Sequence, residues 1–142
     1  MKKLNRKVIA LCFIALLVVG MFPISAFAAI QESEYINSYS VGLSQGSSNG
    51  QLKLSYNIIG TGTMDTIGIT KIVVYKSNGA KYKTIYGSLT NGLLEQNTFS
   101  AFGVYSISVT AGNSYICQVT FYSAKSGGYD TRTVFTNTVA LP

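Results

Sequence analysis

Most of the chain consists of short segments in which hydrophobic and polar side chains alternate with a period of two. Every second side chain is hydrophobic in residues 52–58, and the same holds in residues 105–109 and 115–121. This alternation is typical of half-buried β-strands. Turn-forming sequences separate the segments, and Asn78-Gly79 is a strong hairpin signal among them. The pattern therefore constrains the chain to an all-β fold.

We predict seven strands from this pattern. They are residues 35–44, 52–58, 67–76, 81–86, 105–109, 115–121 and 129–139. Gly60-Thr61-Gly62 is expected to end the second strand, and residues 93–95 are either a single helical turn or a loop. Seven short antiparallel strands without a long helix predict a two-sheet β-sandwich, with a closed barrel as the alternative.

The first 28 residues have the pattern of a secretory signal peptide. A basic start at Lys2, Lys3, Arg6 and Lys7 precedes an apolar run over residues 8–22 and an Ala-Phe-Ala site at residues 26–28. The apolar run is shorter than the roughly 20 residues that span a bilayer. We therefore expect a secreted protein that meets the membrane only during export, with a signal peptide at 1–28 and one domain at 29–142.

The charge of the predicted mature chain differs from that of the whole sequence. Residues 1–28 carry four of the eleven basic residues and none of the five acidic ones, so the net charge falls from +6 to +2. The remaining cations form no dense run, although Lys76, Lys81 and Lys83 lie near one another. Nucleic-acid binding is therefore not expected.

Both cysteines point to a protein that is stabilised by packing alone. Cys12 lies in the predicted signal peptide, so the mature chain has no partner for Cys117. Cys117 alternates in phase with Val119 and Phe121. We interpret it as a small buried side chain and not as a reactive thiol.

The residue types that most enzymes use are scarce. The chain has no histidine, which excludes Ser-His and Cys-His nucleophiles and the commonest zinc ligand. The carboxylates are Glu32, Glu34, Asp65, Glu95 and Asp130. Three of them fall in predicted turns or loops and two near the mature N-terminus, so a glycosidase pair or a calcium site is not indicated. We predict no enzyme activity, no cofactor and no metal.

Residues 112–119, Gly-Asn-Ser-Tyr-Ile-Cys-Gln-Val, carry a resemblance to the immunoglobulin-like and fibronectin type III-like sandwiches. In those folds a tyrosine two residues before a buried position forms a tyrosine corner. The resemblance implies that Tyr115 is buried and that its hydroxyl bonds to backbone near the preceding turn. The chain departs from antibody domains in two ways. It has no tryptophan, and its second predicted strand carries no cysteine that could pair with Cys117. It also resembles small uncharacterised secreted single-domain proteins of Gram-positive bacteria, which implies no particular activity.

Tyrosines are the remaining candidates for function, because all ten lie after residue 28. Tyr82, Tyr86, Tyr122 and Tyr129 are placed on an outer sheet face or on loop tips. Exposed tyrosines offer a large contact area at low entropic cost, which suits the recognition of proteins or sugars. The alternative is that these rings only cover cross-strand neighbours.

We therefore predict a secreted, monomeric or weakly associating domain that presents a surface for extracellular adhesion or recognition. Its partner would be an extracellular protein or a glycan. One alternative is a carbohydrate-binding module that uses the exposed tyrosines. Another is a structural subunit of an extracellular matrix, since the mature chain has no proline before Pro142 to block its edge strands.

Overall fold

The computed structural model describes residues 33–142. The predicted signal peptide, Cys12 and Glu32 lie outside these residues. Within them the fold is all-β and antiparallel, as predicted, and contains no helix. The strands are β1 (Ile36–Gln45), β2 (Gln51–Lys76), β3 (Lys81–Tyr86), β4 (Leu94–Ser108), β5 (Ser114–Lys125), β6 (Gly128–Phe135) and β7 (Val139–Ala140).

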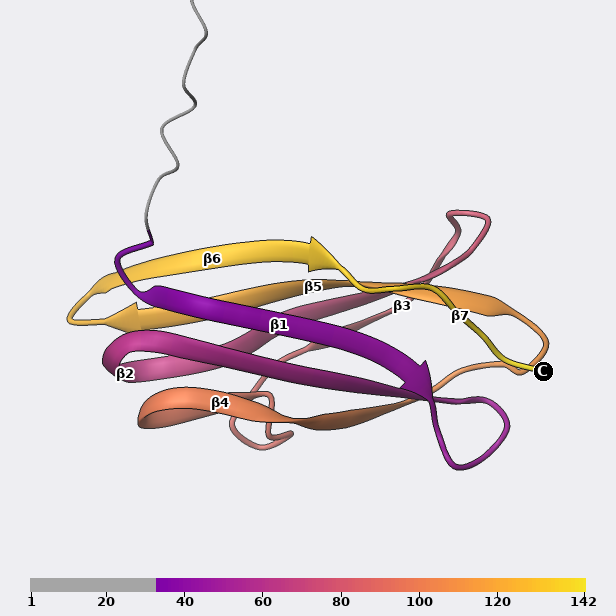
Figure 1. The fold of residues 1–142 in the computed structure, drawn as a ribbon, viewed down its shortest axis with the longest axis horizontal. Coiled ribbons are helices and arrows are strands. Elements are labelled where there is room, and N and C mark those ends of the chain that lie inside the picture. The colour runs from indigo at the N-terminus through magenta and orange to yellow at the C-terminus, as the bar shows by residue number, and fades with distance from the viewer. Residues whose placement is uncertain (1–32) are drawn as a thin grey trace, which may run out of the picture. The chain divides into compact units, whose positions relative to one another are not determined.

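β2 is the central strand and pairs with β1, β3, β4 and β5 (Figure 1). Residues 52–60 of β2 pair with β1, and residues 51–68 pair with β4. Residues 66–76 pair with β5, and residues 71–75 pair with β3. β6 and β7 then pair with β5. The seven strands consequently form one hydrogen-bonded sheet that curls into a half-barrel. The finer prediction of a two-sheet, immunoglobulin-like sandwich stays a prediction.

The prediction that Gly60-Thr61-Gly62 ends a strand is wrong. β2 runs through these residues with a register shift between Ile59 and Met64. A Cβ atom at Gly60 would lie 2.7 Å from Cγ of Met64, whose side chain is buried. Glycine is needed there because Met64 covers the backbone in the region where β2 bends back on itself without ending (Figure 1). The predicted strands at 52–58 and 67–76 are thus two halves of β2.

The predicted last strand at 129–139 is divided into β6 and β7 by three polar residues, 136–138. The backbone of Thr136 donates to the carbonyl of Cys117, and Thr136 Oγ1 accepts from the Cys117 N–H. Asn137 then turns away from β5. Its side-chain amide accepts from the N–H of Leu43 and donates to the Leu43 carbonyl, both at 2.8 Å. Asn137 thereby binds the outer edge of β1 as a neighbouring strand would.

The segment at 88–101 contains a loop and the first half of β4. Ser88 and Asn91 bond to each other through side chain and backbone, which stabilises a turn before Leu93. The Leu93 side chain is fully buried. β4 begins at Leu94, so residues 93–95 form no helical turn.

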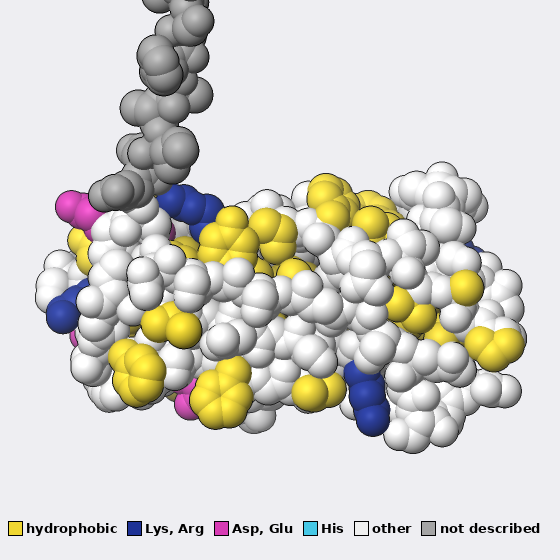
Figure 2. Space-filling model, viewed as in Figure 1, with side chains coloured by type: hydrophobic (Ala, Val, Ile, Leu, Met, Phe, Trp, Pro, Cys, Tyr) yellow, Lys and Arg dark blue, Asp and Glu magenta, His cyan; other side chains and the backbone are white. Residues whose placement is uncertain are grey.

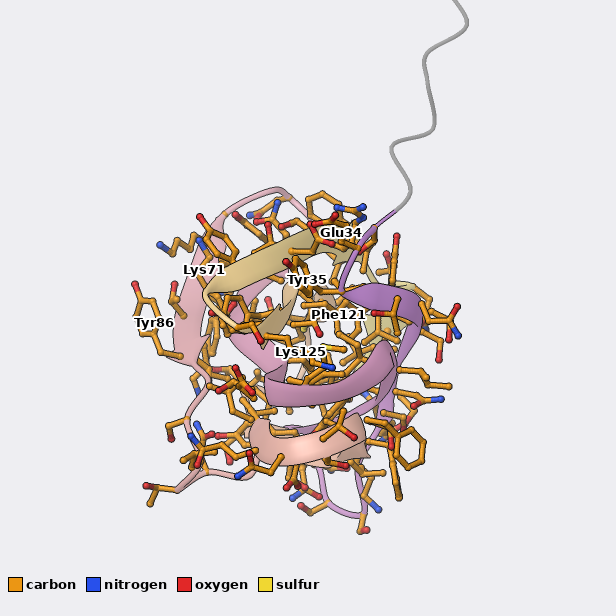
Figure 3. All side chains as sticks on the ribbon, turned by 90° about the vertical axis from the view of Figure 1, so that its left-hand side faces the viewer. Glu34, Tyr35, Lys71, Tyr86, Phe121 and Lys125 are labelled. Atoms are coloured by element: carbon orange, nitrogen blue, oxygen red, sulfur yellow. The ribbon has the colours of Figure 1, made fainter. Side chains whose placement is uncertain are left out.

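The core lies inside the curl of the sheet, where the inward side chains of β2 and β5 meet. Leu52, Leu54 and Ile58 of β2 are fully buried, as are Val119 and Phe121 of β5. Seen end-on, the strands surround this core, with Phe121 in the interior (Figure 3). The alternation in the sequence correctly predicts these inward positions.

Tyr115 has the geometry predicted from the tyrosine-corner resemblance. Its side chain is fully buried, and its hydroxyl donates to the carbonyl of Thr110 at 2.7 Å. Thr110 precedes the turn that leads into β5. The buried position of Tyr115 and its hydrogen bond are therefore confirmed.

Candidate recognition surface

The outer face of the second half of the sheet gathers exposed aromatic side chains. We call this set the aromatic surface. It consists of Tyr75 on β2, Tyr86 on β3, Tyr122 on β5, and Tyr129 and Phe135 on β6. Tyr86, Tyr129 and Phe135 are 71%, 64% and 59% exposed, which is unusual for large rings on a folded domain.

Strand register explains why these residues share a face. Along β5 the odd-numbered residues from Tyr115 to Ser123 are buried, so Tyr122 and the other even-numbered ones point outward. Tyr122 is opposite Thr131 and Ala124 is opposite Tyr129, so the two tyrosines are diagonal neighbours. Gln118 is opposite both Val73 and Phe135, which extends the same outer face across β2, β5 and β6.

Four of the five rings form two pairs. Tyr122 and Tyr129 stack with centroids 5.8 Å apart and an interplanar angle of 28°. Tyr75 and Phe135 are tilted by 46° with centroids 6.4 Å apart. Each pair brings rings from different strands into contact, which restrains these four side chains.

Polar groups separate the two ring pairs. The hydroxyls of Thr120 and Thr133 are hydrogen-bonded at 3.1 Å. Lys71 lies opposite both Tyr86 and Thr120 in register. Lys71 and Tyr86 extend from the same side of the sheet (Figure 3). The aromatic surface therefore combines ring faces with hydroxyl groups and the ammonium group of Lys71.

Three of the four tyrosines proposed from the sequence, Tyr86, Tyr122 and Tyr129, come together on this surface. The placement of Tyr82 on the same face is wrong. A register shift between Val74 and Tyr75 turns Tyr82 toward the core, where it contacts the Tyr115 ring edge-on at 5.4 Å. Its hydroxyl is 3.2 Å from Oγ1 of Thr110.

Sequence reasoning missed Tyr75 and Phe135. Both were detectable by alternation: Tyr75 is in phase with Lys71, and Phe135 is in phase with Tyr129. The sequence does not show which face of β2 is the outer one, because Val73 is hydrophobic and buried although it lies on the same face as Tyr75.

Two of the described carboxylates, those of Asp65 and Asp130, have structural partners. Asp65 accepts from the backbone N–H of Ser126 at 2.8 Å. Asp130 accepts from the Ser33 hydroxyl and from the Tyr35 N–H, and these bonds lower the pKa of its carboxyl group. In residues 33–142 no three His, Cys, Asp or Glu side chains lie close enough together to hold a metal ion. These carboxylates tie β1 and a hairpin to their neighbours.

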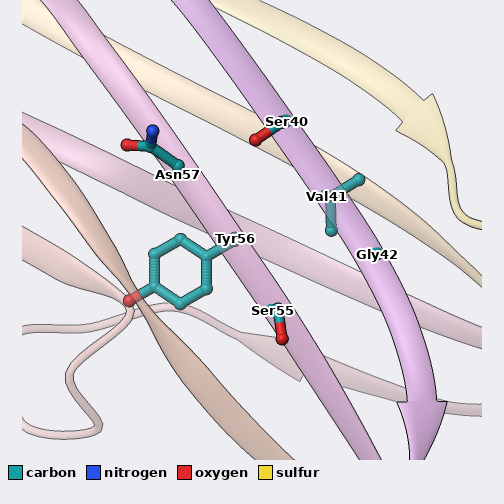
Figure 4. Close-up of a pocket in the computed structure, with 6 residues that line it drawn as sticks. All are labelled: Ser40, Val41, Gly42, Ser55, Tyr56 and Asn57. Carbon is teal, nitrogen blue, oxygen red and sulfur yellow. The ribbon is translucent and has the colours of Figure 1, made fainter.

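A shallow groove lies on the outer face between β1 and β2 (Figure 4). Its lining residues are Ser40, Val41, Gly42, Ser55, Tyr56 and Asn57. The Tyr56 hydroxyl points away from it and donates to the Gly92 carbonyl at 2.8 Å. Burial and, to a lesser extent, the Glu95 carboxylate raise the pKa of Tyr56. The groove thus offers hydroxyl and amide groups without an acid–base pair.

Cys117 is fully buried, as predicted, and burial raises the pKa of its thiol to about 12. Its thiol therefore stays protonated in the folded protein at pH values at which an exposed thiol ionises. The position supports its interpretation as a core residue, and a nucleophilic role needs a thiolate.

We expect Cys117 to lower the stability of the protein at alkaline pH. Above the ordinary thiol pKa of 9.0 the unfolded chain loses a proton that the folded chain keeps until about pH 12. The unfolding free energy should therefore fall by up to about 1.4 kcal/mol per pH unit in this range. Denaturant titrations of the native chain and of Cys117→Ala at pH 7 to 10.5 measure the difference. Parallel curves for the two proteins, or rapid thiol labelling of native protein, would contradict the assignment.

Neither a membrane-spanning helix nor a known relative identifies the protein. None of residues 33–142 forms a helix long and apolar enough to cross a membrane. No protein-family model matches the chain, and no match is found among curated proteins or solved structures. The function has to be argued from the geometry of the described residues.

Proposed function

We propose that the protein is a secreted, non-enzymatic domain whose aromatic surface mediates extracellular adhesion or recognition. The observation that carries this proposal is the clustering of five aromatic side chains on one outer sheet face, three of them more than half exposed. Export is supported by the signal-peptide pattern of residues 1–28.

The cost of exposing such rings supports a binding role. A large apolar side chain loses roughly 1.5–3 kcal/mol of burial energy when it stays in water. Exposed clusters of this kind typically mark sites at which another molecule is bound. The rings are also carried by paired strands, and a ligand site on regular elements is held more rigidly than one on loops.

A polysaccharide is the second candidate ligand, and the Tyr122–Tyr129 stack favours it. The two ring planes are within 28° of each other, and the Thr120 and Thr133 hydroxyls lie on the same face. A sugar ring presents apolar C–H faces and peripheral hydroxyls. Stacked rings beside neutral hydrogen-bonding groups match both of these features.

We further propose that the curled sheet is related to the two-sheet, immunoglobulin-like sandwich. The buried Tyr115 with its hydroxyl bond to Thr110 supports this relation. The two halves of β2, one paired with β1 and the other with β5 and β3, would correspond to strands of the two sheets. An experimental structure in which these halves lie in one flat layer would contradict it.

The aromatic surface is tested by binding to arrays of glycans and extracellular proteins. The chain is exported from its full-length gene, and intact mass verifies that it begins at Ala29. We expect Tyr86→Ala/Tyr129→Ala to weaken binding to the ligand found at least tenfold, because the two most exposed tyrosines of the surface are removed.

Phe102→Ala is the matched control for this double variant. Phe102 is 74% exposed but lies on β4, and so outside the aromatic surface. Binding should survive this change. The proposal is contradicted if the native chain binds no array ligand, or if Phe102→Ala reduces binding as much as the double variant.

A further inference from the structure

The outer edge of β4 is unpaired along most of its length. β4 pairs with β2 on one side, and no strand of residues 33–142 pairs with its other side. The Lys83 ammonium group donates to the Ser108 carbonyl at the end of the strand. Residues 101–107 have no such cover. An open strand edge offers a row of backbone donors and acceptors to another strand.

The other outer strands carry features that discourage pairing. β3 has Lys81 and Lys83 within six residues. Asn137 occupies the edge of β1 at Leu43. β6 includes Asp130 and Arg132. β4 has no charged residue and no proline from residue 96 to residue 108.

The side chains of β4 add an apolar surface to this edge. Phe102 and Val104 are 74% and 61% exposed, and both point to the outer face opposite Asn57 and Ser55. Hydrophobic side chains accordingly line the lower margin of the molecule in Figure 2, over β4. An uncharged edge flanked by exposed apolar groups is the type of strand that pairs between chains.

We propose that two copies of this chain pair antiparallel through β4, with a two-fold axis at Gly103. The sequence around Gly103 is self-complementary in hydropathy. In this register the opposing residues are Phe102–Val104, Ala101–Tyr105, Ser100–Ser106 and Phe99–Ile107. On the outer face the exposed Phe102 meets Val104 and each serine meets a serine, whereas Ala101 and Ile107 stay buried in the core of their own protomer. Glycine at the axis brings no side chain into the closest approach.

The self-complementarity identifies a second copy as the occupant of the edge. A register centred on Phe102 would oppose Val104 to Ser100, and one centred on Val104 would oppose Phe102 to Ser106. Only the central register at Gly103 forms apolar pairs on both sides of the axis. A two-fold interface uses both edges at once and leaves none open, so it yields dimers and not fibres.

Sedimentation velocity of the exported chain over a concentration series tests the dimer. We expect reversible dimerisation, and Val104→Lys should weaken it at least tenfold because it places a lysine opposite Phe102 in both halves of the interface. Ser40→Lys is the matched control, since Ser40 is exposed on the same outer sheet face two strands away. Circular dichroism checks that both variants fold. A native chain that is monomeric at millimolar concentration overturns the proposal, as does a dimer that Val104→Lys leaves intact.

Disulfide trapping tests the register. Opposed residues in an antiparallel pair have Cα atoms about 4.5–5.5 Å apart, within the range of a disulfide. Phe102→Cys mixed with Val104→Cys should cross-link rapidly, and Phe102→Cys alone should do so slowly. The buried Cys117 does not interfere. Equal rates in the two samples would overturn the pairing centred on Gly103.

Discussion

Replacing Gly68 with alanine is expected to destabilise the protein by about 3–5 kcal/mol. Gly68 has a φ of 145°, a conformation that residues with a Cβ atom rarely adopt. A Cβ atom at this position would overlap the Leu93 carbonyl oxygen and lie 3.0 Å from Cα of Leu94. The free-energy costs of backbone strain and of the clash with backbone atoms therefore add.

The surrounding strands leave little room for this clash to relax. Gly68 pairs with Leu94 of β4 on one side and with Tyr122 of β5 on the other. The N–H of Ile69 donates to the Leu93 carbonyl at 2.7 Å. Moving Leu93 away from a new methyl group would lengthen this bond and displace a fully buried side chain.

Gly42→Ala is the matched control for Gly68→Ala. Gly42 is also in a strand, but it has no positive φ, and a Cβ atom there would have no neighbour within 4 Å. Its unfolding free energy should change by less than about 1 kcal/mol, with a slight gain from the lower entropy of the unfolded chain. Urea or guanidinium unfolding measures both variants. Similar midpoints for the two would contradict the geometry at Gly68.

The inward side chains of the fold were predictable because they depend on a local period. Tyr115, Cys117, Val119 and Phe121 alternate along β5, and all four are buried. The period specifies which residues share a face, and hydrophobicity specifies which face is inside. The exposed Tyr86 and Tyr129 followed from the same reasoning.

The course of β2 was not predictable from the same local pattern. Glycine has two structural uses, since it permits turns and it permits close approach of other atoms. At Gly60 both uses apply, because β2 bends back on itself in this region and Met64 covers the backbone there. Only the tertiary structure shows that pairing with β4 resumes after the bend, so that the strand does not end. A strand of 26 residues is also far longer than the usual strand, so two shorter strands were the more reasonable prediction.

Contacts between residues that are far apart in the chain also could not be predicted from the sequence. Asn137 binds the edge of β1 at Leu43, 94 positions earlier in the chain. The register shift beside Tyr75 turns Tyr82 inward, and no sequence signal announces that shift. The composition of the aromatic surface depends on both the shift and the curl of the sheet, so two of its five members escaped prediction.

Tyr115→Ala is expected to cost about 3–5 kcal/mol of stability, because it removes a fully buried ring from the core. The ring contacts that of Tyr82, so the cavity would also loosen β3. Tyr115→Phe keeps the ring and removes only the hydroxyl that bonds to Thr110 at 2.7 Å. A loss of about 1–1.5 kcal/mol is expected for that bond.

Tyr122→Phe separates the corner hydrogen bond from the general effect of losing a tyrosine hydroxyl. Tyr122 lies on the same strand as Tyr115 but points outward into the stack with Tyr129. Its substitution should change the unfolding free energy by less than about 0.5 kcal/mol, as surface changes usually do. Denaturant midpoints of the three variants give the comparison. If Tyr115→Phe were as harmless as Tyr122→Phe, the Thr110 bond would contribute nothing, and the proposed kinship with immunoglobulin-like sandwiches would lose its main support.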